Sequence, residues 1–215
     1  MLKFINNESS IPASEISVAL GIAPYCHRET SCQVRREFSK QEQRDMGAGK
    51  RLQHVGIKAF EKAMTRAGKN LQVHPQEQRK TVSHPLLPLH GQPDGLYENA
   101  VLEVKYSKYK KRKLPLWYYL QTVCYMECVG VEYGYVCIGR IGDPSGIVIY
   151  RIYRPPPLLR YGEYIVWYAM QIRMRRNAMP VIVALSREQK ASLRRSIQAD
   201  IANCVKKEAF VSLKS

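Results

Sequence analysis

The chain has 215 residues, and its 34 Lys and Arg side chains outnumber its 18 Asp and Glu side chains, which gives a formal net charge of +16. Apolar residues make up 45% of the sequence, which is enough for a hydrophobic core and argues against an intrinsically disordered chain. The basic surplus is typical of a protein that binds a polyanion, most often nucleic acid. We see no membrane-spanning run and no secretory signal, so we expect an intracellular protein, in the cytoplasm or a host cell interior, with no membrane partner. The six cysteines contain no Cys-x-x-Cys pair and are expected to be free thiols.

The first third of the chain is predicted to be helical. Ser14 is a candidate N-cap for a short helix over Glu15–Leu20. Apolar residues at helical spacing predict a second helix over Gln41–Ala67, with Gly68 as its C-cap. Prolines then indicate that residues 69–92 form loops and at most one short strand.

From Pro93 onwards the apolar pattern changes to the period of two that β-strands have. Strands and helices alternate, which predicts an α/β fold with a small mixed β-sheet flanked by helices. We expect one domain over residues 1–215, with a core over about 12–154 and a C-terminal helical extension, 155–215, packed on it. The predicted strands are Gly95–Tyr97, Val101–Tyr106, Glu132–Arg140 and Ile147–Arg154, and the predicted helices are Leu116–Val129, Tyr161–Arg176 and Arg187–Glu208.

Two carboxylates and one lysine are predicted to meet at the start of this sheet. Glu103 and Lys105 are alternate residues of one strand, so their side chains share a face. A hairpin-like return places Asp94 beside them. Two converging carboxylates repel each other unless a cation lies between them, and Mg²⁺ or Mn²⁺ favours such oxygen ligands. A metal-activated water beside a lysine is suited to hydrolysis of a phosphodiester.

Seven short segments follow one another in a recognisable order along the first two thirds of the chain. They are Ala13-Ser14-Glu15-Ile16, Leu20-Gly21-Ile22-Ala23-Pro24-Tyr25, Gly49-Lys50-Arg51-Leu52-Gln53, Ser83-His84-Pro85, Gly91-Gln92-Pro93-Asp94-Gly95-Leu96, Leu102-Glu103-Val104-Lys105 and Tyr118-Tyr119-Leu120-Gln121. This ordered series resembles the PD-(D/E)xK nuclease superfamily, and specifically its lambda exonuclease-like branch, the RecB-like branch that holds the YqaJ-type viral recombinases. The resemblance covers roughly residues 12–140 and implies a restriction-endonuclease-like core.

The resemblance implies a role for each residue of this group. Asp94 and Glu103 would be metal ligands, and the Val104 carbonyl would add a third oxygen. Lys105 would be the catalytic lysine. Gln121, on the helix that follows, would position the water, the lysine or the phosphate. The implied cofactor is Mg²⁺ or Mn²⁺.

The chain departs from the family at one ligand position. Where the family usually places a Glu on the helix after Gly49, this sequence has Gln53 followed by His54. The register favours Gln53, whereas chemistry favours His54 because imidazole is a good ligand for Mn²⁺. Adjacent helical positions point about 100° apart, so we expect only one of the two side chains to face the metal.

Cations close to the proposed site are candidate DNA contacts. A dense basic run with interleaved tyrosines, Tyr106 and Tyr109, accompanies the end of the strand that holds Glu103 and Lys105. Its cations are suited to binding phosphates and its tyrosines to stacking on bases. The resemblance adds Ser14 at the family's opening helix, and Arg35 and Arg36 after that helix. The basic run consists of Lys108, Lys110, Lys111, Arg112 and Lys113.

We therefore expect a Mg²⁺- or Mn²⁺-dependent deoxyribonuclease, most simply an exonuclease acting on double-stranded DNA ends in recombination, repair or viral replication. One alternative is a structure-specific endonuclease of the Holliday junction resolvase type. Another is a DNA-binding module whose catalysis is weakened because Gln53 replaces a carboxylate. The resemblance also implies a homo-oligomer, a trimer or a dimer, and a single-strand annealing or recombination protein as a further partner.

Overall fold

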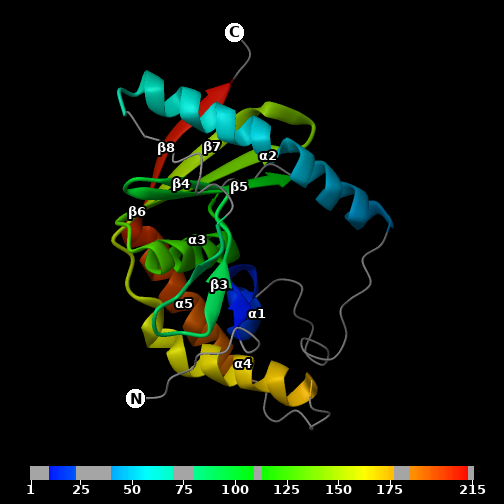
Figure 1. Ribbon diagram of the computed structural model, residues 1–215, viewed down its shortest axis with the longest axis vertical. Helices are drawn as coiled ribbons and strands as arrows, with labels where there is room; N and C mark the ends of the chain where they lie inside the picture. Colours follow the sequence, from blue (N-terminus) through cyan, green and yellow to red (C-terminus); the bar gives the residue numbers. More distant parts are fainter. Residues whose placement is uncertain (1–9, 23–39, 70–79, 109–112, 177–184, 213–215) are drawn as a thin grey trace.

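The computed structural model describes residues 10–22, 40–69, 80–108, 113–176 and 185–212. Its centre is a five-stranded sheet with the order β4-β5-β6-β7-β8 (Figure 1). Strands β5 and β6 are parallel, and the other neighbouring pairs are antiparallel. A smaller sheet has the order β1-β3-β2. The strands are β1 (Ile11–Pro12), β2 (Val82–Ser83), β3 (Leu89–Gly91), β4 (Gly95–Tyr97), β5 (Ala100–Ser107), β6 (Tyr133–Arg140), β7 (Asp143–Tyr153) and β8 (Val205–Ser212).

Helices cover both faces of the five-stranded sheet, which confirms the predicted α/β class. Helix α2 lies across one face, and α3 lies against the other face with α1, α4 and α5 beyond it (Figure 1). The N-terminal end of α2, drawn in blue, extends past the sheet. The helices are η2 (Ala13–Glu15), α1 (Ile16–Ala19), α2 (Lys40–Arg66), α3 (Leu116–Val129), η3 (Leu158–Tyr161), α4 (Gly162–Arg176) and α5 (Arg187–Cys204).

The alternation of side chains along β5 builds two cores, one on each side of the sheet. Leu102 and Val104 point to one face and pack with Phe60 of α2. The Phe60 ring lies 5.0 Å from the ring of Tyr135 between centroids, which fastens α2 to the sheet. Val101 points to the other face and belongs to the core around α3. Glu103 and Lys105 share the side of Val101, as the period of two predicts.

Both ends of helix α3 follow the signals in the sequence. Pro115 is the N-cap residue of α3 and has an extended backbone, which fits the fixed φ of proline. Gly130 ends α3 with φ at 79°, and its N–H donates to the Met126 carbonyl at 2.8 Å. Such a left-handed C-terminal residue favours glycine because a side chain would be strained there. Helix α2 spans nearly the whole of its predicted range.

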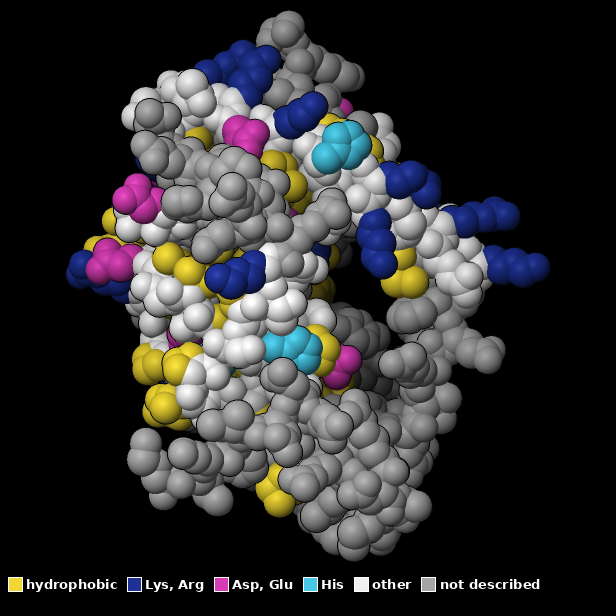
Figure 2. Space-filling view, in the orientation of Figure 1, with side chains coloured by type: hydrophobic (Ala, Val, Ile, Leu, Met, Phe, Trp, Pro, Cys, Tyr) yellow, Lys and Arg dark blue, Asp and Glu magenta, His cyan; other side chains and the backbone are white. Residues whose placement is uncertain are grey.

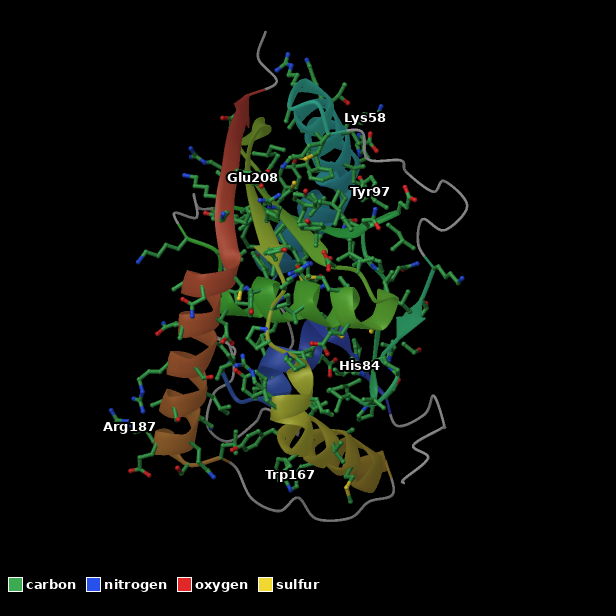
Figure 3. All side chains as sticks on the ribbon, turned by 90° about the vertical axis from the view of Figure 1, so that its left-hand side faces the viewer. Lys58, His84, Tyr97, Trp167, Arg187 and Glu208 are labelled. Carbon is green, nitrogen blue, oxygen red and sulfur yellow. The ribbon has the colours of Figure 1, made fainter. Side chains whose placement is uncertain are left out.

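The predicted helix over Arg187–Glu208 is wrong in its last part. Helix α5 ends at Cys204, and the chain then forms β8, which pairs with β7 and completes the sheet. Glu208 lies on this strand (Figure 3), where its carboxylate pairs with Lys69 at 2.6 Å and with Arg151 at 2.7 Å. Pairing with a distant strand decides this segment, and local helix propensity does not reveal it.

Three smaller expectations at element boundaries are also corrected. Ser14 is not an N-cap, because it lies inside η2 and α1 has Glu15 at its N-cap with no side-chain hydrogen bond. The segment predicted as loops holds two short strands, β2 and β3, which pair with each other. Strand β7 begins at Asp143, four residues before the predicted start at Ile147.

Within the described ranges, none of the helices is both long and apolar enough to cross a membrane. The described cysteines are free thiols, as expected, and Cys26 and Cys32 lie outside the described residues. The described free thiols are Cys124, Cys128, Cys137 and Cys204.

Candidate active site

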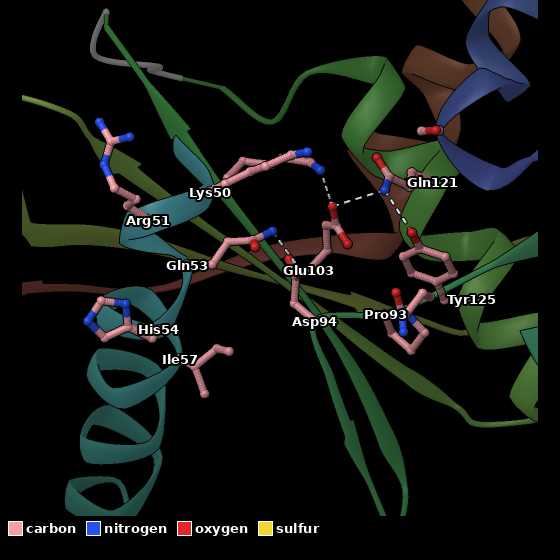
Figure 4. A pocket seen from close by; sticks show the side chains of 13 residues that line it. Lys50, Arg51, Gln53, His54, Ile57, Pro93, Asp94, Glu103, Gln121 and Tyr125 are labelled. Atoms are coloured by element: carbon pink, nitrogen blue, oxygen red, sulfur yellow. Dashed lines mark hydrogen bonds and ion pairs between the residues drawn. The ribbon is translucent and has the colours of Figure 1, made fainter. Parts of the chain in front are cut away.

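A pocket of about 720 Å³ opens where α2, β5 and α3 come together (Figure 4). Its floor carries the carboxylates and the lysine predicted from the sequence, and its α2 wall carries cations. The segment before β4 and the turn η2 supply the remaining walls. The lining residues are Ser14, Lys50, Arg51, Gln53, His54, Ile57, Gln92, Pro93, Asp94, Glu103, Lys105, Gln121 and Tyr125.

Asp94 is held in place from two directions. Its backbone N–H donates to the Leu102 carbonyl at 3.0 Å, which continues the pairing of β4 with β5. Its Oδ2 accepts from the Val104 N–H at 2.7 Å, and its Oδ1 accepts from Gln53 Nε2 at 2.9 Å. The carboxylate therefore links the sheet to α2, and its position is fixed by hydrogen bonds on both of its oxygens.

Glu103 is a buried carboxylate, with 2% of its side chain exposed. Its Oε1 accepts from Gln121 Nε2 at 3.0 Å and pairs with Lys105 Nζ. Both contacts use Oε1, and among the described residues Oε2 has no hydrogen-bond donor. Burial raises the pKa of Glu103 to about 7, against the lowering effect of Lys105, and Asp94 raises it further. The site thus holds a buried carboxylate whose described contacts are made by one of its two oxygens.

Lys105 shares the α3-facing side of β5 with Glu103. Burial lowers its pKa, but the neighbouring Glu103 carboxylate outweighs burial, and the net shift of the Lys105 pKa is upward. Its Nζ also lies 5.8 Å from the centre of the Tyr118 ring, within the range of a cation–π contact. The lysine is therefore held as a cation that borders the pocket.

Gln121 connects α3 to the carboxylates. Its buried amide donates to Glu103 Oε1 and to the Tyr125 hydroxyl, the latter at 2.8 Å. Burial raises the pKa of Tyr125, with the Glu103 carboxylate adding to the effect, so the tyrosine stays a neutral acceptor. The sequence alone places Gln121 on a helix, and the structure adds that its amide contacts Glu103.

Gln53 and His54 take different positions, as adjacent residues of a helix must. The Gln53 side chain is turned toward Asp94 and donates to it, whereas His54 lies on a more exposed part of α2 (Figure 4). Both residues still line the pocket. Gln53 is therefore the α2 residue in contact with a carboxylate, and His54 lies at the pocket wall.

The predicted DNA contacts are only partly within the described residues. Ser14 lines the pocket, and Lys108 and Lys113 are exposed on either side of a segment that is not described. Sequence reasoning did not assign Lys50 and Arg51 to the site, although both line it. Their spacing from Gln53 and His54 was the available signal, because helical residues three or four apart share a face. The predicted contacts that lie outside the described residues are Arg35, Arg36, Lys110, Lys111 and Arg112.

The donor set of the pocket fits a hard divalent cation with water ligands. Asp94 and Glu103 supply two carboxylates from adjacent parts of the sheet, and Glu103 keeps one oxygen without a described donor. In the described ranges, no cluster of three or more His, Cys, Asp and Glu side chains has metal-binding geometry. Mg²⁺ commonly binds proteins through one or two carboxylates and keeps several waters, so two carboxylates are a sufficient protein contribution.

The fold as a whole is similar to that of solved exonucleases. The crystal structure of an alkaline exonuclease (LHK-Exo) from Laribacter hongkongensis superposes with a TM-score of 0.54 and 15% sequence identity, over 90% of this chain and 96% of that chain. This chain has the fold of that exonuclease. A structure of LHK-Exo in complex with dAMP gives a TM-score of 0.52 and 17% identity, over 92% of this chain and 94% of that chain.

The similarity is one of fold and not of close sequence. No protein-family model matches the sequence, and no curated protein matches it. At 15–17% identity the shared fold says how the chain is arranged, and the chemistry has to be argued from the pocket itself.

Proposed function

We propose that this protein is a metal-dependent deoxyribonuclease, and specifically an exonuclease that acts on the ends of double-stranded DNA. The observation that carries the proposal is the convergence of Asp94, Glu103 and Lys105 in one pocket. Cations on the α2 wall of that pocket and a net charge of +16 favour a phosphate-bearing polymer as the substrate. The fold shared with an alkaline exonuclease supports the same reaction class.

Asp94 and Glu103 would hold a divalent cation, Mg²⁺ or Mn²⁺, with the Val104 carbonyl as a third oxygen. From α2, either the Gln53 amide or the His54 imidazole would complete the ligands. Gln53 has the better position, because its side chain already contacts Asp94. When bound, such a cation supplies a water of lowered pKa and neutralises charge on the phosphate.

The other polar residues of the pocket would orient the reacting groups. Lys105 is a half-buried cation next to Glu103 and would donate to the attacking water or to a phosphate oxygen in the transition state. Gln121 would keep Glu103 in a single orientation through its hydrogen bond to Oε1. Lys50 and Arg51 would bind the phosphates on either side of the scissile bond.

DNA binding is proposed to extend beyond the pocket. Lys108 and Lys113 are exposed, and together with the cations predicted between them they would add phosphate contacts. Ser14, Arg35 and Arg36 complete the proposed contacts. A role in recombination, repair or viral replication, a homo-oligomeric state and a recombination or annealing partner belong to the same proposal.

The test is a comparison of linear and covalently closed circular duplex DNA. The purified protein is incubated with each in Mg²⁺, in Mn²⁺ and in EDTA, next to the Asp94→Asn and Lys105→Ala variants. Glu132→Gln is a matched control, because Glu132 is an exposed acid in a surface ion pair with Arg154. We expect digestion of the linear DNA only, lost in EDTA and in both site variants and kept in the control.

The other outcomes contradict the proposal in distinguishable ways. Cleavage of the circle with the same dependence would assign an endonuclease of the Holliday junction resolvase type. Digestion that persists in Asp94→Asn would place the chemistry elsewhere.

A second candidate function is a DNA-binding module with weakened catalysis. The contact between the neutral Gln53 amide and Asp94 favours it, because an amide is a weaker cation ligand than a carboxylate. DNA binding without cleavage in either metal would support this module and exclude the nuclease.

A further inference from the structure

The exposed side of α2 carries a line of cations that continues past the pocket. At about 100° per residue, five basic positions of this helix fall within about 40° of one another around its axis. All five side chains are exposed. In Figure 2, Lys and Arg side chains follow α2 along the rim of a hollow. The five residues, which we call the α2 stripe, are Lys40, Arg44, Arg51, Lys58 and Lys62.

The α2 stripe has no ion-pair partner among the side chains that the structure describes. The opposite side of α2 supplies buried contacts, through Phe60 and Met64. Lys40 and Arg44, like Lys58 and Lys62, are like charges four residues apart, and such pairs destabilise a helix unless an anion lies beside them. The arrangement therefore favours a bound polyanion.

The α2 stripe is continuous with the pocket. Arg51 belongs to both, and the exposed His54 lies between Arg51 and Lys58 along the helix and also lines the pocket. From Lys40 to Lys62 the stripe spans about 33 Å at about 1.5 Å per residue. That length matches roughly ten base pairs of duplex DNA, at about 3.4 Å per pair.

We propose that the α2 stripe binds the sugar–phosphate backbone of a DNA duplex whose end lies in the pocket. This inference rests on the proposed nuclease function and adds a surface that sequence reasoning did not assign. Its contribution would be to hold the duplex outside the pocket, independent of base sequence, because lysine and arginine contacts to phosphates carry no sequence information. The cations of the stripe outside the pocket would then change DNA affinity and leave the chemistry itself unaltered.

The test neutralises three stripe residues that do not line the pocket, in the variant Arg44→Gln/Lys58→Gln/Lys62→Gln. The matched control is Arg187→Gln/Arg195→Gln/Lys206→Gln, which removes the same charge from exposed positions of α5 and β8. Figure 3 places Arg187 at the opposite end of the molecule from Lys58. Binding of a labelled 30-base-pair duplex is measured in EDTA across a salt series, so that the result does not require cleavage.

Each phosphate contact contributes about 0.9 to the slope of log affinity against log salt. We expect the stripe variant to reduce that slope by about 2.7 and to weaken duplex binding at low salt by at least about tenfold. The control variant should change the salt slope and the duplex affinity by much less. Cleavage of a small phosphodiester that occupies only the pocket should be unchanged in the stripe variant. Equal losses in the two variants would overturn the inference, because they would show a non-specific effect of net charge.

Failure of this inference is distinguishable from failure of the proposed function. A stripe variant with wild-type affinity and slope would overturn the inference, while metal-dependent cleavage by the wild type would keep the nuclease. A wild-type protein that binds DNA through the stripe and cleaves nothing would overturn the nuclease and keep the binding surface.

Discussion

Helix α3 takes part in two polar clusters, which differ in how many oxygens of their glutamate are hydrogen-bonded within the protein. Near its C-terminal end, both oxygens of Glu127 are bonded, Oε1 to the Leu158 N–H and Oε2 to His84 Nε2, each at 2.7 Å. The His84 Nδ1 in turn accepts from two backbone N–H groups at 3.1 Å. In the pocket, by contrast, Gln121 of α3 contacts Glu103, whose described contacts are both made by one oxygen.

The difference separates a carboxylate that holds the fold together from the one that we propose as a cation ligand. Glu127 of α3 joins the segment of His84 to that of Leu158. Both of its carboxylate oxygens are used in hydrogen bonds within the protein. Glu103 is more deeply buried but keeps an oxygen without a described donor, next to a pocket of about 720 Å³. Because Glu103 lines the pocket, a cation or a water held there could bind its second oxygen. Of these two glutamates, only Glu103 therefore combines burial with access to a ligand.

The largest effect is expected from Glu103→Gln. The amide keeps the shape of the side chain but removes the charge needed to hold a cation, so DNA cleavage should fall by about a thousandfold or more. Stability should change by less than about 1 kcal/mol, because Lys105 reaches the pocket and can be solvated after its partner is lost. Cleavage rates and urea denaturation of the same preparation check both statements. A variant that cleaves normally would remove Glu103 from the proposed chemistry.

Glu127→Ala should have the opposite profile. Loss of the carboxylate leaves the Leu158 N–H and the His84 ring without their partner, which should reduce the free energy of unfolding by about 2–3 kcal/mol. Cleavage by the folded protein should be retained, because Glu127 does not line the pocket. In Glu127→Gln, which keeps an acceptor for the Leu158 N–H, the free energy of unfolding should fall by less. If Glu127→Ala inactivated a folded protein, the two clusters would not be separable.

The sequence was sufficient to predict those parts of the site that depend on contacts between residues close together in the chain. Asp94, Glu103 and Lys105 lie within one short hairpin, so strand periodicity and a turn bring them together. The α2 contact was harder to predict, because a small rotation of the helix decides whether Gln53 or His54 meets Asp94, and packing of Phe60 on the sheet sets that rotation. Strand β8 was missed because its partner, β7, is distant in the sequence.

Gln121→Leu should reduce activity by an intermediate amount. Leucine has a similar volume but no donor, so Glu103 would lose the hydrogen bond that orients it, and we expect a loss of about 10- to 100-fold. Because Gln121 is proposed to act through Glu103, the loss should appear in kcat and in the metal concentration needed, and not in KM for DNA. Tyr125→Phe is the matched comparison, since it removes only the second partner of the same amide. An equal loss in Tyr125→Phe would contradict a direct role for the Gln121–Glu103 bond.

The smallest effect is expected from Gln53→Glu, which places a third carboxylate beside Asp94. Without a divalent cation, the substitution replaces a hydrogen-bond donor by a like charge, and the free energy of unfolding should fall by about 1 kcal/mol. With Mg²⁺ present the added carboxylate becomes a ligand, so the loss should be recovered and the Mg²⁺ concentration for half-maximal cleavage should fall several-fold. Thermal unfolding in EDTA and in Mg²⁺ measures the first effect, and a metal titration of cleavage measures the second. His54→Glu separates position from charge, because it adds the same carboxylate at an adjacent, more exposed residue of α2. If His54→Glu lowered the metal requirement more than Gln53→Glu, the imidazole position would be the one that faces the cation.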